Sequence, residues 1–216
     1  MDGKLKTIFV GILLVIAVAI RVYDAATNPS PPELTGSSQL ESAQDGKEGR
    51  YFVLEDCVYV PDEKYNDGDS FKIKTSDGRV VEIRMYFVDA AESKDKPYDD
   101  YRRRVADQGK DFGGLDYQET IRLGREAKKY AASRLRKQNL TVFTAWEEVY
   151  DSGRYYAFVR MENGKFWHQE LVEKGLARIH TKGADLPGGT DRRSRENELR
   201  GLEQKAKHAR VGGWGY

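Results

Sequence analysis

The sequence predicts an α+β protein, built mainly as a closed β-barrel with helices packed against it. Five segments are rich in aromatic and β-branched residues or alternate apolar with polar residues, and turn residues separate several of them. Such segments are typical of short antiparallel strands. Three further segments place their apolar residues at helical spacing, and one of them lies between the third and fourth predicted strands.

The predicted strands follow from side-chain alternation and turn chemistry. In the second of them, Phe71 and Ile73 alternate with lysines, so one face of the strand is expected to be buried. The dipeptide Asp77-Gly78 then predicts a hairpin turn, because this pair tolerates the positive φ of tight turns. The five predicted strands are Tyr51–Val60, Ser70–Thr75, Val80–Val88, Leu140–Trp146 and Arg154–Met161.

Three helices are predicted from apolar spacing and end signals. They are Glu119–Gln138, His168–Lys174 and Ser194–Ala209, with Gly175 expected to end the second and Ser194 to cap the third. The order of strands and helices, with a long helix joining the third and fourth strands, is that of a five-stranded antiparallel barrel of the OB-fold type.

The N-terminal part of the chain reads as a targeting segment followed by a linker. Lys4 and Lys6 precede an apolar run, Ile8–Ile20. A helix of this length spans about 20 Å, less than the roughly 30 Å of a hydrocarbon core. Residues 1–26 are therefore expected to be an export signal, either cleaved or kept as a signal-anchor that tethers the protein to a membrane.

Residues 27–49 are rich in Pro, Ser, Gly and charge and poor in large apolar residues, which predicts a flexible polar linker. The globular domain is expected over 50–216. The chain carries 36 Lys and Arg against 35 Asp and Glu, so its net charge gives no nucleic-acid signal by itself. Cys57 is the only cysteine, which excludes an internal disulfide.

Five charged residues on or beside predicted strands suggest a chemistry. These are Asp69, Arg84, Asp89, Glu92 and Arg154. Carboxylates suit a hard divalent cation, and arginine forks suit phosphate oxygens. Each residue alone is explained as well by an ordinary role, such as a loop former or an ion-pair partner. Together they predict a metal-assisted phosphodiester hydrolase.

The strings that carry these residues resemble the staphylococcal (micrococcal) nuclease family. The resemblance extends over roughly residues 51 to 214. It includes DGDS at 67–70, RMYFVDAAE at 84–92, Gly153-Arg154 at a strand start, LGREA at 123–127 and LVEKGLA at 171–177.

The resemblance implies a calcium site and a catalytic group. The carboxylates of Asp69 and Asp89 and the carbonyl of Ala90 would bind Ca²⁺. Glu92 would hold the attacking water and act as general base. The implied activity is a Ca²⁺-dependent endonuclease that acts on DNA and also on RNA and leaves 3′-phosphate ends. From the N-terminal segment we expect it to act outside the cytoplasm, and we expect a monomer.

The two arginines would act on the substrate phosphate. Arg84 and Arg154 would donate bidentate hydrogen bonds to it, most strongly as negative charge develops in the transition state.

The sequence also departs from the family pattern. Ala90-Ala91 replaces the usual Thr-Pro before the glutamate. The two tyrosines that flank the nucleotide in the family's type member are missing, since the corresponding region is Ile179–Gly183, and Ser152 stands where another nucleotide-contacting tyrosine is expected. Base recognition is therefore not predicted.

The segment Ser93–Tyr117 is longer than in the type member, and two interpretations remain open. Its mixture of tyrosines and arginines suits the binding of a single strand by stacking and charge. Alternatively, it is a helical excursion that packs Tyr101, Val105 and Phe112 on the barrel. A non-catalytic nucleic-acid-binding or protein-binding module, tethered to the cell envelope, is the alternative to the enzyme.

Overall fold

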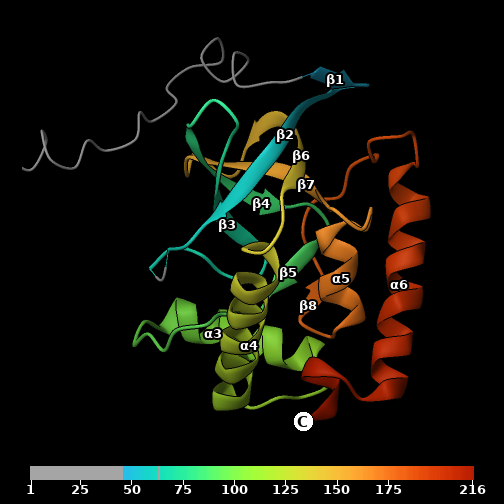
Figure 1. Cartoon of the computed structure of the whole chain (residues 1–216). Coiled ribbons are helices and arrows are strands. Elements are labelled where there is room, and N and C mark those ends of the chain that lie inside the picture. The colour runs from blue at the N-terminus through green and yellow to red at the C-terminus, as the bar shows by residue number, and fades with distance from the viewer. Residues whose placement is uncertain (1–45, 63) are drawn as a thin grey trace, which may run out of the picture. The chain divides into compact units, whose positions relative to one another are not determined.

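The computed structural model describes residues 46–62 and 64–216 (Figure 1). The predicted targeting segment at 1–26 and the linker up to residue 45 lie outside these residues. Within the described ranges, no helix has the length and apolar character that crossing a bilayer requires.

The predicted strands are found, with three differences in their extent. The first and last predicted strands have their predicted ends, the second ends one residue early, and the fourth extends to Glu148. The third predicted strand ends at Met85, and a separate strand begins at Val88, because Phe87 lies between them with a φ of 71°. The strands are β1 (Gly46–Glu48), β2 (Tyr51–Val60), β3 (Ser70–Lys74), β4 (Val80–Met85), β5 (Val88–Ala90), β6 (Leu140–Glu148), β7 (Arg154–Met161) and β8 (Ala177–Ile179).

Five of these strands close a ring. The sheet order is β1-β2-β3-β4-β7-β6, and β2 also pairs with β6, so the path β2-β3-β4-β7-β6 returns to β2. This arrangement is consistent with the predicted OB-fold-like barrel. The sheet is mostly antiparallel, as predicted, and β4 and β7 form its one parallel pair in the described residues. The other four pairs of the ring are antiparallel, so closing a ring of five strands requires β4 and β7 to run in the same direction.

Three short strands, β1, β5 and β8, were not predicted as separate elements. β1 pairs with the start of β2 and lies within the stretch interpreted as linker. β5 and β8 form a separate two-stranded sheet, with Asp89 opposite Arg178.

The structure has four α-helices in the described ranges rather than the three predicted. The helices are α3 (Asp99–Asp111), α4 (Tyr117–Leu135), α5 (Trp167–Glu173) and α6 (Arg192–Ala209), followed by a 3₁₀ turn η1 (Gly212–Gly215). The cap of α6 is Asp191, whose side chain accepts from the backbone N–H of Ser194, so Ser194 itself is not the cap.

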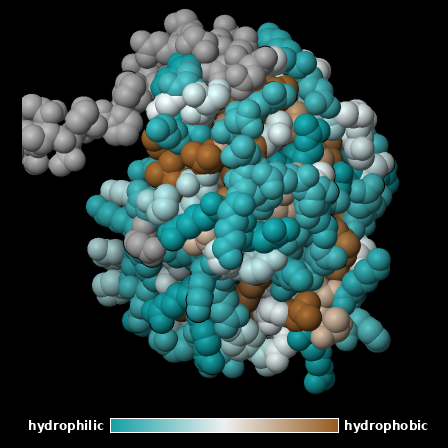
Figure 2. Space-filling model, viewed as in Figure 1, coloured by the Kyte–Doolittle hydropathy of each residue, from teal (hydrophilic) through white to brown (hydrophobic). Residues whose placement is uncertain are grey.

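The additional helix, α3, lies in the long segment after Glu92 and supports the interpretation of a helical excursion. Its Tyr101 and Val105 are buried against Ile121 of α4. A Cβ at Gly109 would lie 2.4 Å from the carbonyl oxygen of Leu115, so only glycine allows this close approach. In Figure 1, α3 and α4 lie side by side below the barrel strands. Hydrophilic residues cover most of this face of the molecule (Figure 2).

Candidate active site

The predicted site residues gather where β3, β4 and β5 meet. Asp69 directly precedes β3, and its neighbour Ser70 is paired with Arg84 on β4. The Met85 N–H donates to the Asp69 carbonyl oxygen at 2.8 Å, which fixes the loop against the end of β4. Asp89 lies in β5, immediately after the chain turns at Phe87.

Arg84 joins the two aspartates. Its Nη1 lies 2.7 Å from Asp69 Oδ1, and its Nη2 lies 2.6 Å from Asp89 Oδ1. The Asp69 side chain is 2% exposed and those of Arg84 and Asp89 are each 16% exposed. Because a guanidinium has five N–H donors and two are used here, Arg84 can still donate to a further anion.

The loop that carries Asp69 is held from two sides. The indole Nε1 of buried Trp167 donates to the Gly68 carbonyl oxygen at 2.9 Å. A Cβ at Gly68 would lie 2.9 Å from the Cβ of Ala127 and 3.1 Å from that of Ala90, so a side chain would push the loop away from α4 and β5. The Ala90 N–H in turn donates to Asp69 Oδ2. Trp167 therefore packs in the hydrophobic core and also holds the loop that carries Asp69.

Gln108 connects α3 to the site. Its side chain is buried, and its Nε2 donates to Asp89 Oδ2 at 3.0 Å and to the Ala90 carbonyl oxygen at 3.1 Å. Its Oε1 accepts from the Glu92 N–H at 3.0 Å. One amide thus contacts three of the residues that the sequence assigns to metal binding and catalysis.

Arg178 of β8 is a second residue that the sequence analysis missed. It lies opposite Asp89 in the β5–β8 pair, and its Nε and Nη2 lie 2.9 and 2.8 Å from Asp89 Oδ2. Its Nη1 also donates to Asp111 Oδ2 at the end of α3, at 2.5 Å. Asp89 is therefore held by two arginines and one glutamine.

Glu92 is positioned by contacts with α3 and α4. Its carboxylate Oε1 lies 2.8 Å from Arg104 Nη2, in a pair that is largely open to solvent on the arginine side. Its backbone packs on α4, where a Cβ at Gly124 would lie 2.2 Å from the Glu92 carbonyl oxygen. The glycine is needed because helix and loop touch backbone to backbone.

Arg154 shares a sheet face with Arg84 without joining the aspartate cluster. In the parallel β4–β7 pair, Arg84 is opposite Tyr156 and Glu82 is opposite Arg154. Residues two apart on a strand lie on the same face, so the two arginines do too. Among the described residues, the side-chain hydrogen bond of Arg154 goes from Nε to Ser152 Oγ, at 3.1 Å, and no ion pair links it to Asp69 or Asp89.

Burial and neighbouring charges shift the pKa values of Asp69 and Asp89 in opposite directions. Burial raises the pKa of Asp69 to about 7, although Arg84 acts in the opposite direction. Burial also acts to raise the pKa of Asp89, but Arg84, Gln108 and Arg178 outweigh it and leave this pKa below its usual value. The pKa of Arg84 is raised, because its two aspartates outweigh the effect of burial.

The donor set fits a hard cation such as Ca²⁺. Asp69, Asp89 and the Ala90 carbonyl supply oxygen atoms only, as such a cation prefers. Each Oδ1 accepts one bond from Arg84 and keeps a second lone-pair direction. No cluster of three metal-ligating side chains occurs among the described residues, so a cation here would depend on two side chains, the backbone carbonyl and water.

The positions predicted to lack nucleotide-binding tyrosines are also placed. Ile179 ends β8, and the chain through Lys182 returns to Phe87, whose N–H donates to the Lys182 carbonyl oxygen at 2.9 Å. Ser152 lies in the turn before β7 and accepts the bond from Arg154.

Comparison with known proteins supports the resemblance seen in the sequence. The family model described as staphylococcal nuclease homologue matches residues 82–216. The match includes Arg84, Asp89, Glu92 and Arg154 and begins after Asp69. None of the curated proteins compared with the chain matches it. Family members are generally nucleases that typically use Ca²⁺, and the match supports a nuclease-like or nucleic-acid-binding module. Because the match covers more than half of the chain, the protein belongs to the staphylococcal nuclease homologue family.

Proposed function

We propose that the protein is a Ca²⁺-dependent endonuclease that hydrolyses phosphodiester bonds of DNA and RNA and leaves 3′-phosphate ends. The observation that carries this proposal is the contact of Arg84 with both Asp69 and Asp89, beside a Glu92 whose backbone is fixed by Gln108. A scaffold gains nothing in folding from burying two carboxylates at one guanidinium, because desolvation largely offsets such pairs.

The chain's own residues supply most of the chemistry. Glu92 accepts a proton from water as the water oxygen bonds to phosphorus. The bond from phosphorus to the 5′ oxygen breaks, and this leaving oxygen takes a proton from solvent water. Arg84 uses its remaining N–H groups, and Arg154 its guanidinium from the neighbouring strand, to bind the phosphate oxygens as they gain charge. The cation, held by Asp69, Asp89 and the Ala90 carbonyl, would supply Lewis-acid polarisation of the phosphate.

The location of this activity belongs to the same proposal. The apolar run at 8–20 would take the domain across a membrane, where Ca²⁺ is plentiful, either as a free monomer or on a tether. The sequence of the mature N-terminus from fractionated cells tests this. A soluble cytosolic protein with Met1 intact would contradict both forms of export.

The activity is tested with a labelled oligonucleotide in the presence of Ca²⁺, Mg²⁺ or chelator. We expect hydrolysis that needs Ca²⁺, since Mg²⁺ demands a compact octahedral site and loses its water reluctantly. Glu92→Gln should lower kcat by at least about 10²-fold, the lower range for positioned proton transfer. Glu147→Gln, which alters a carboxylate bound to Lys182 and Arg50 on the surface, is the matched control. A folded protein that binds the oligonucleotide and never cleaves it would instead support a non-catalytic binding module.

A further inference from the structure

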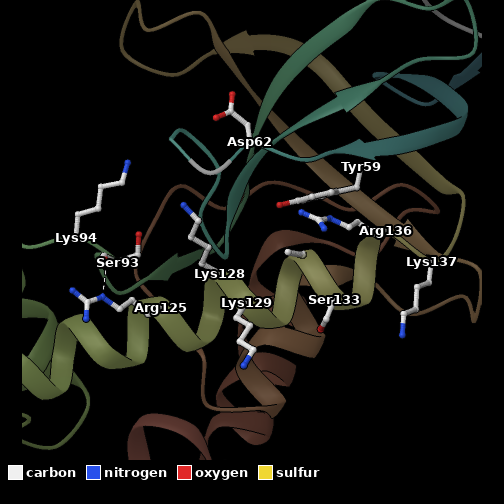
Figure 3. Close-up of a pocket in the computed structure, with 11 residues that line it drawn as sticks. Tyr59, Asp62, Ser93, Lys94, Arg125, Lys128, Lys129, Ser133, Arg136 and Lys137 are labelled. Carbon is white, nitrogen blue, oxygen red and sulfur yellow. Dashed lines mark hydrogen bonds between the residues drawn. The ribbon is translucent and has the colours of Figure 1, made fainter.

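A groove of about 640 Å³ lies along one face of α4, outside the aspartate cluster. In Figure 3, Lys128 and Arg136 project towards Tyr59 and Asp62, Arg125 lies beside Ser93, and Lys129, Ser133 and Lys137 project from the other edge of the helix. The lining residues are Tyr59, Asp62, Ser93, Lys94, Arg125, Lys128, Lys129, Ala132, Ser133, Arg136 and Lys137.

The groove concentrates positive charge in a chain that is nearly neutral. Six of its lining residues are Lys or Arg and one is acidic, whereas the whole chain has a net charge of +1. The acidic residue, Asp62, forms its ion pair with Lys72, which does not line the groove, at 2.9 Å. The lining of the groove therefore has an excess of positive charge, which suits an anion with several charges.

The basic helix α6 shows the contrasting arrangement. Several of its cations are paired with glutamates three or four residues away on the same helix, as a solvated helix face requires. The pairs are Arg195–Glu198 at 3.0 Å, Arg200–Glu196 at 2.6 Å and Lys207–Glu203 at 2.9 Å. In the described chain, Lys129 and Lys137 of the groove form no such ion pair.

The groove-lining residues on and just after α4 form a row with cations towards both ends. Positions 125, 128, 129, 132 and 133 lie along α4, Arg136 and Lys137 directly follow its last residue, and the small residues Ala132 and Ser133 separate the two groups of cations. Basic residues near a helix C-terminus are expected from the helix dipole, which accounts for Arg136 and Lys137. It does not account for Arg125, Lys128 and Lys129 in the middle of the helix. The row is about 18 Å long at the helical rise of ~1.5 Å per residue.

One end of the groove touches the candidate active site. Ser93 lines the groove and directly follows Glu92. Its carbonyl oxygen accepts from Arg125 Nε at 3.2 Å, and its hydroxyl donates to Asp67 Oδ1 at 2.6 Å. Asp67 is two residues before Asp69. A strand that leaves the scissile bond past Glu92 therefore enters the groove at Ser93.

We propose that this groove binds the phosphate backbone of the nucleic-acid strand next to the bond that is cut. The inference rests on the proposed nuclease function and adds a substrate-binding surface to it. Tyr59 is buried beneath Arg136, with 6.0 Å from the guanidinium carbon to the ring centroid, so it offers no open ring for base stacking. The groove binds through charge, without sequence preference, and favours substrates long enough to reach from Glu92 to Lys137.

The test compares two double variants that remove equal charge from exposed positions. Lys129→Gln with Lys137→Gln alters the groove, and the control is Lys174→Gln, at the residue after α5, with Lys205→Gln on α6. Binding of a 20-nucleotide single strand is measured over a salt series in proteins that also carry Glu92→Gln. Cleavage of the same strand and of a dinucleotide is measured in proteins that keep Glu92. Because each lost phosphate contact on a single strand lowers the salt slope by about 0.7, the groove variant should lose about 1.4 and the control nothing. Its KM should rise for the long strand, and dinucleotide cleavage should be unchanged.

The outcomes separate this inference from the proposed function. Equal salt slopes for both double variants would overturn the groove, even if Glu92-dependent cleavage is intact. A reduced slope in the groove variant with no cleavage by the wild type would support the groove and overturn the nuclease. A groove variant that keeps the nucleic-acid slope and loses binding to phosphatidylserine vesicles would show that the groove serves a membrane surface, and would also overturn the inference.

Discussion

Replacing Gln108 with leucine removes the amide that joins α3 to the candidate site while keeping a side chain of similar size. Three hydrogen bonds are lost, at 3.0, 3.1 and 3.0 Å. Asp89 keeps Arg84 and Arg178 as partners, so the loss falls mainly on the Ala90 carbonyl and the Glu92 N–H. A buried polar group left without a partner costs about 1–3 kcal/mol, so we expect the free energy of unfolding to fall by that order.

The same change should lower turnover, because Glu92 loses the bond that fixes its backbone. If about 1.4 kcal/mol of the lost positioning is felt in the transition state, kcat falls about tenfold. KM should change little, since Gln108 does not line the basic groove on α4. Urea unfolding and steady-state cleavage of one oligonucleotide measure the two effects.

The matched control is Gln118→Leu, the same substitution at an exposed position in the first turn of α4. It should leave stability within about 0.5 kcal/mol of the wild type. A Gln108→Leu protein that equals this control in both unfolding free energy and kcat would refute the role assigned to the amide.

Three further outcomes are expected. Gly124→Ala places a Cβ 2.2 Å from the Glu92 carbonyl oxygen and should cost about 1–3 kcal/mol of stability with reduced cleavage, whereas Gly201→Ala, with nothing within 4 Å, should stabilise α6 by about 0.5–1 kcal/mol in the same urea titration. Burial lowers the pKa of His168 to about 3 from 6.5, so the unfolded chain binds the extra proton and stability falls as pH drops from 6.5 towards 3. His168→Leu should remove this loss, up to about 1.4 kcal/mol per pH unit, and an unchanged pH profile of thermal unfolding would contradict it. Arg154→Lys should recover little of the activity lost in Arg154→Ala, because an ammonium cannot copy the guanidinium fork, and near wild-type kcat in either variant would exclude this role.

Local sequence patterns were enough to predict most strands of the barrel. The strand Arg154–Met161 and the strand Tyr51–Val60 were predicted with their observed ends, because aromatic and β-branched residues fill them and turn residues bound them. The parallel β4–β7 pair was not predicted, since pairing between strands some 70 residues apart leaves no mark in either strand alone.

The candidate site was predicted in part for a similar reason. Asp69, Arg84 and Asp89, which the sequence analysis grouped, lie in contact, while Gln108 and Arg178 reach them from distant segments. One signal for Gln108 was available. It lies three residues after Val105 and seven after Tyr101, on the apolar stripe of α3, where a polar residue needs a buried partner. Arg178 carries no comparable signal, because a basic residue beside an apolar strand segment is common.

The shared direction of β4 and β7 sets a rule for which changes of chain length the protein tolerates. Arg84 and Arg154 are fixed to one face by a ladder in which Glu82 meets Arg154 and Arg84 meets Tyr156. Lengthening the turn at 149–153 by a residue would leave that ladder intact only if the extra residue bulges out. A shift of the ladder by one position would turn Arg154 to the opposite face, where buried Ile83 and Met85 lie. We therefore expect insertions in this turn to be accommodated by β-bulges and not by a change in the register of β7. A similar irregularity is already present in β6 between Thr144 and Glu148.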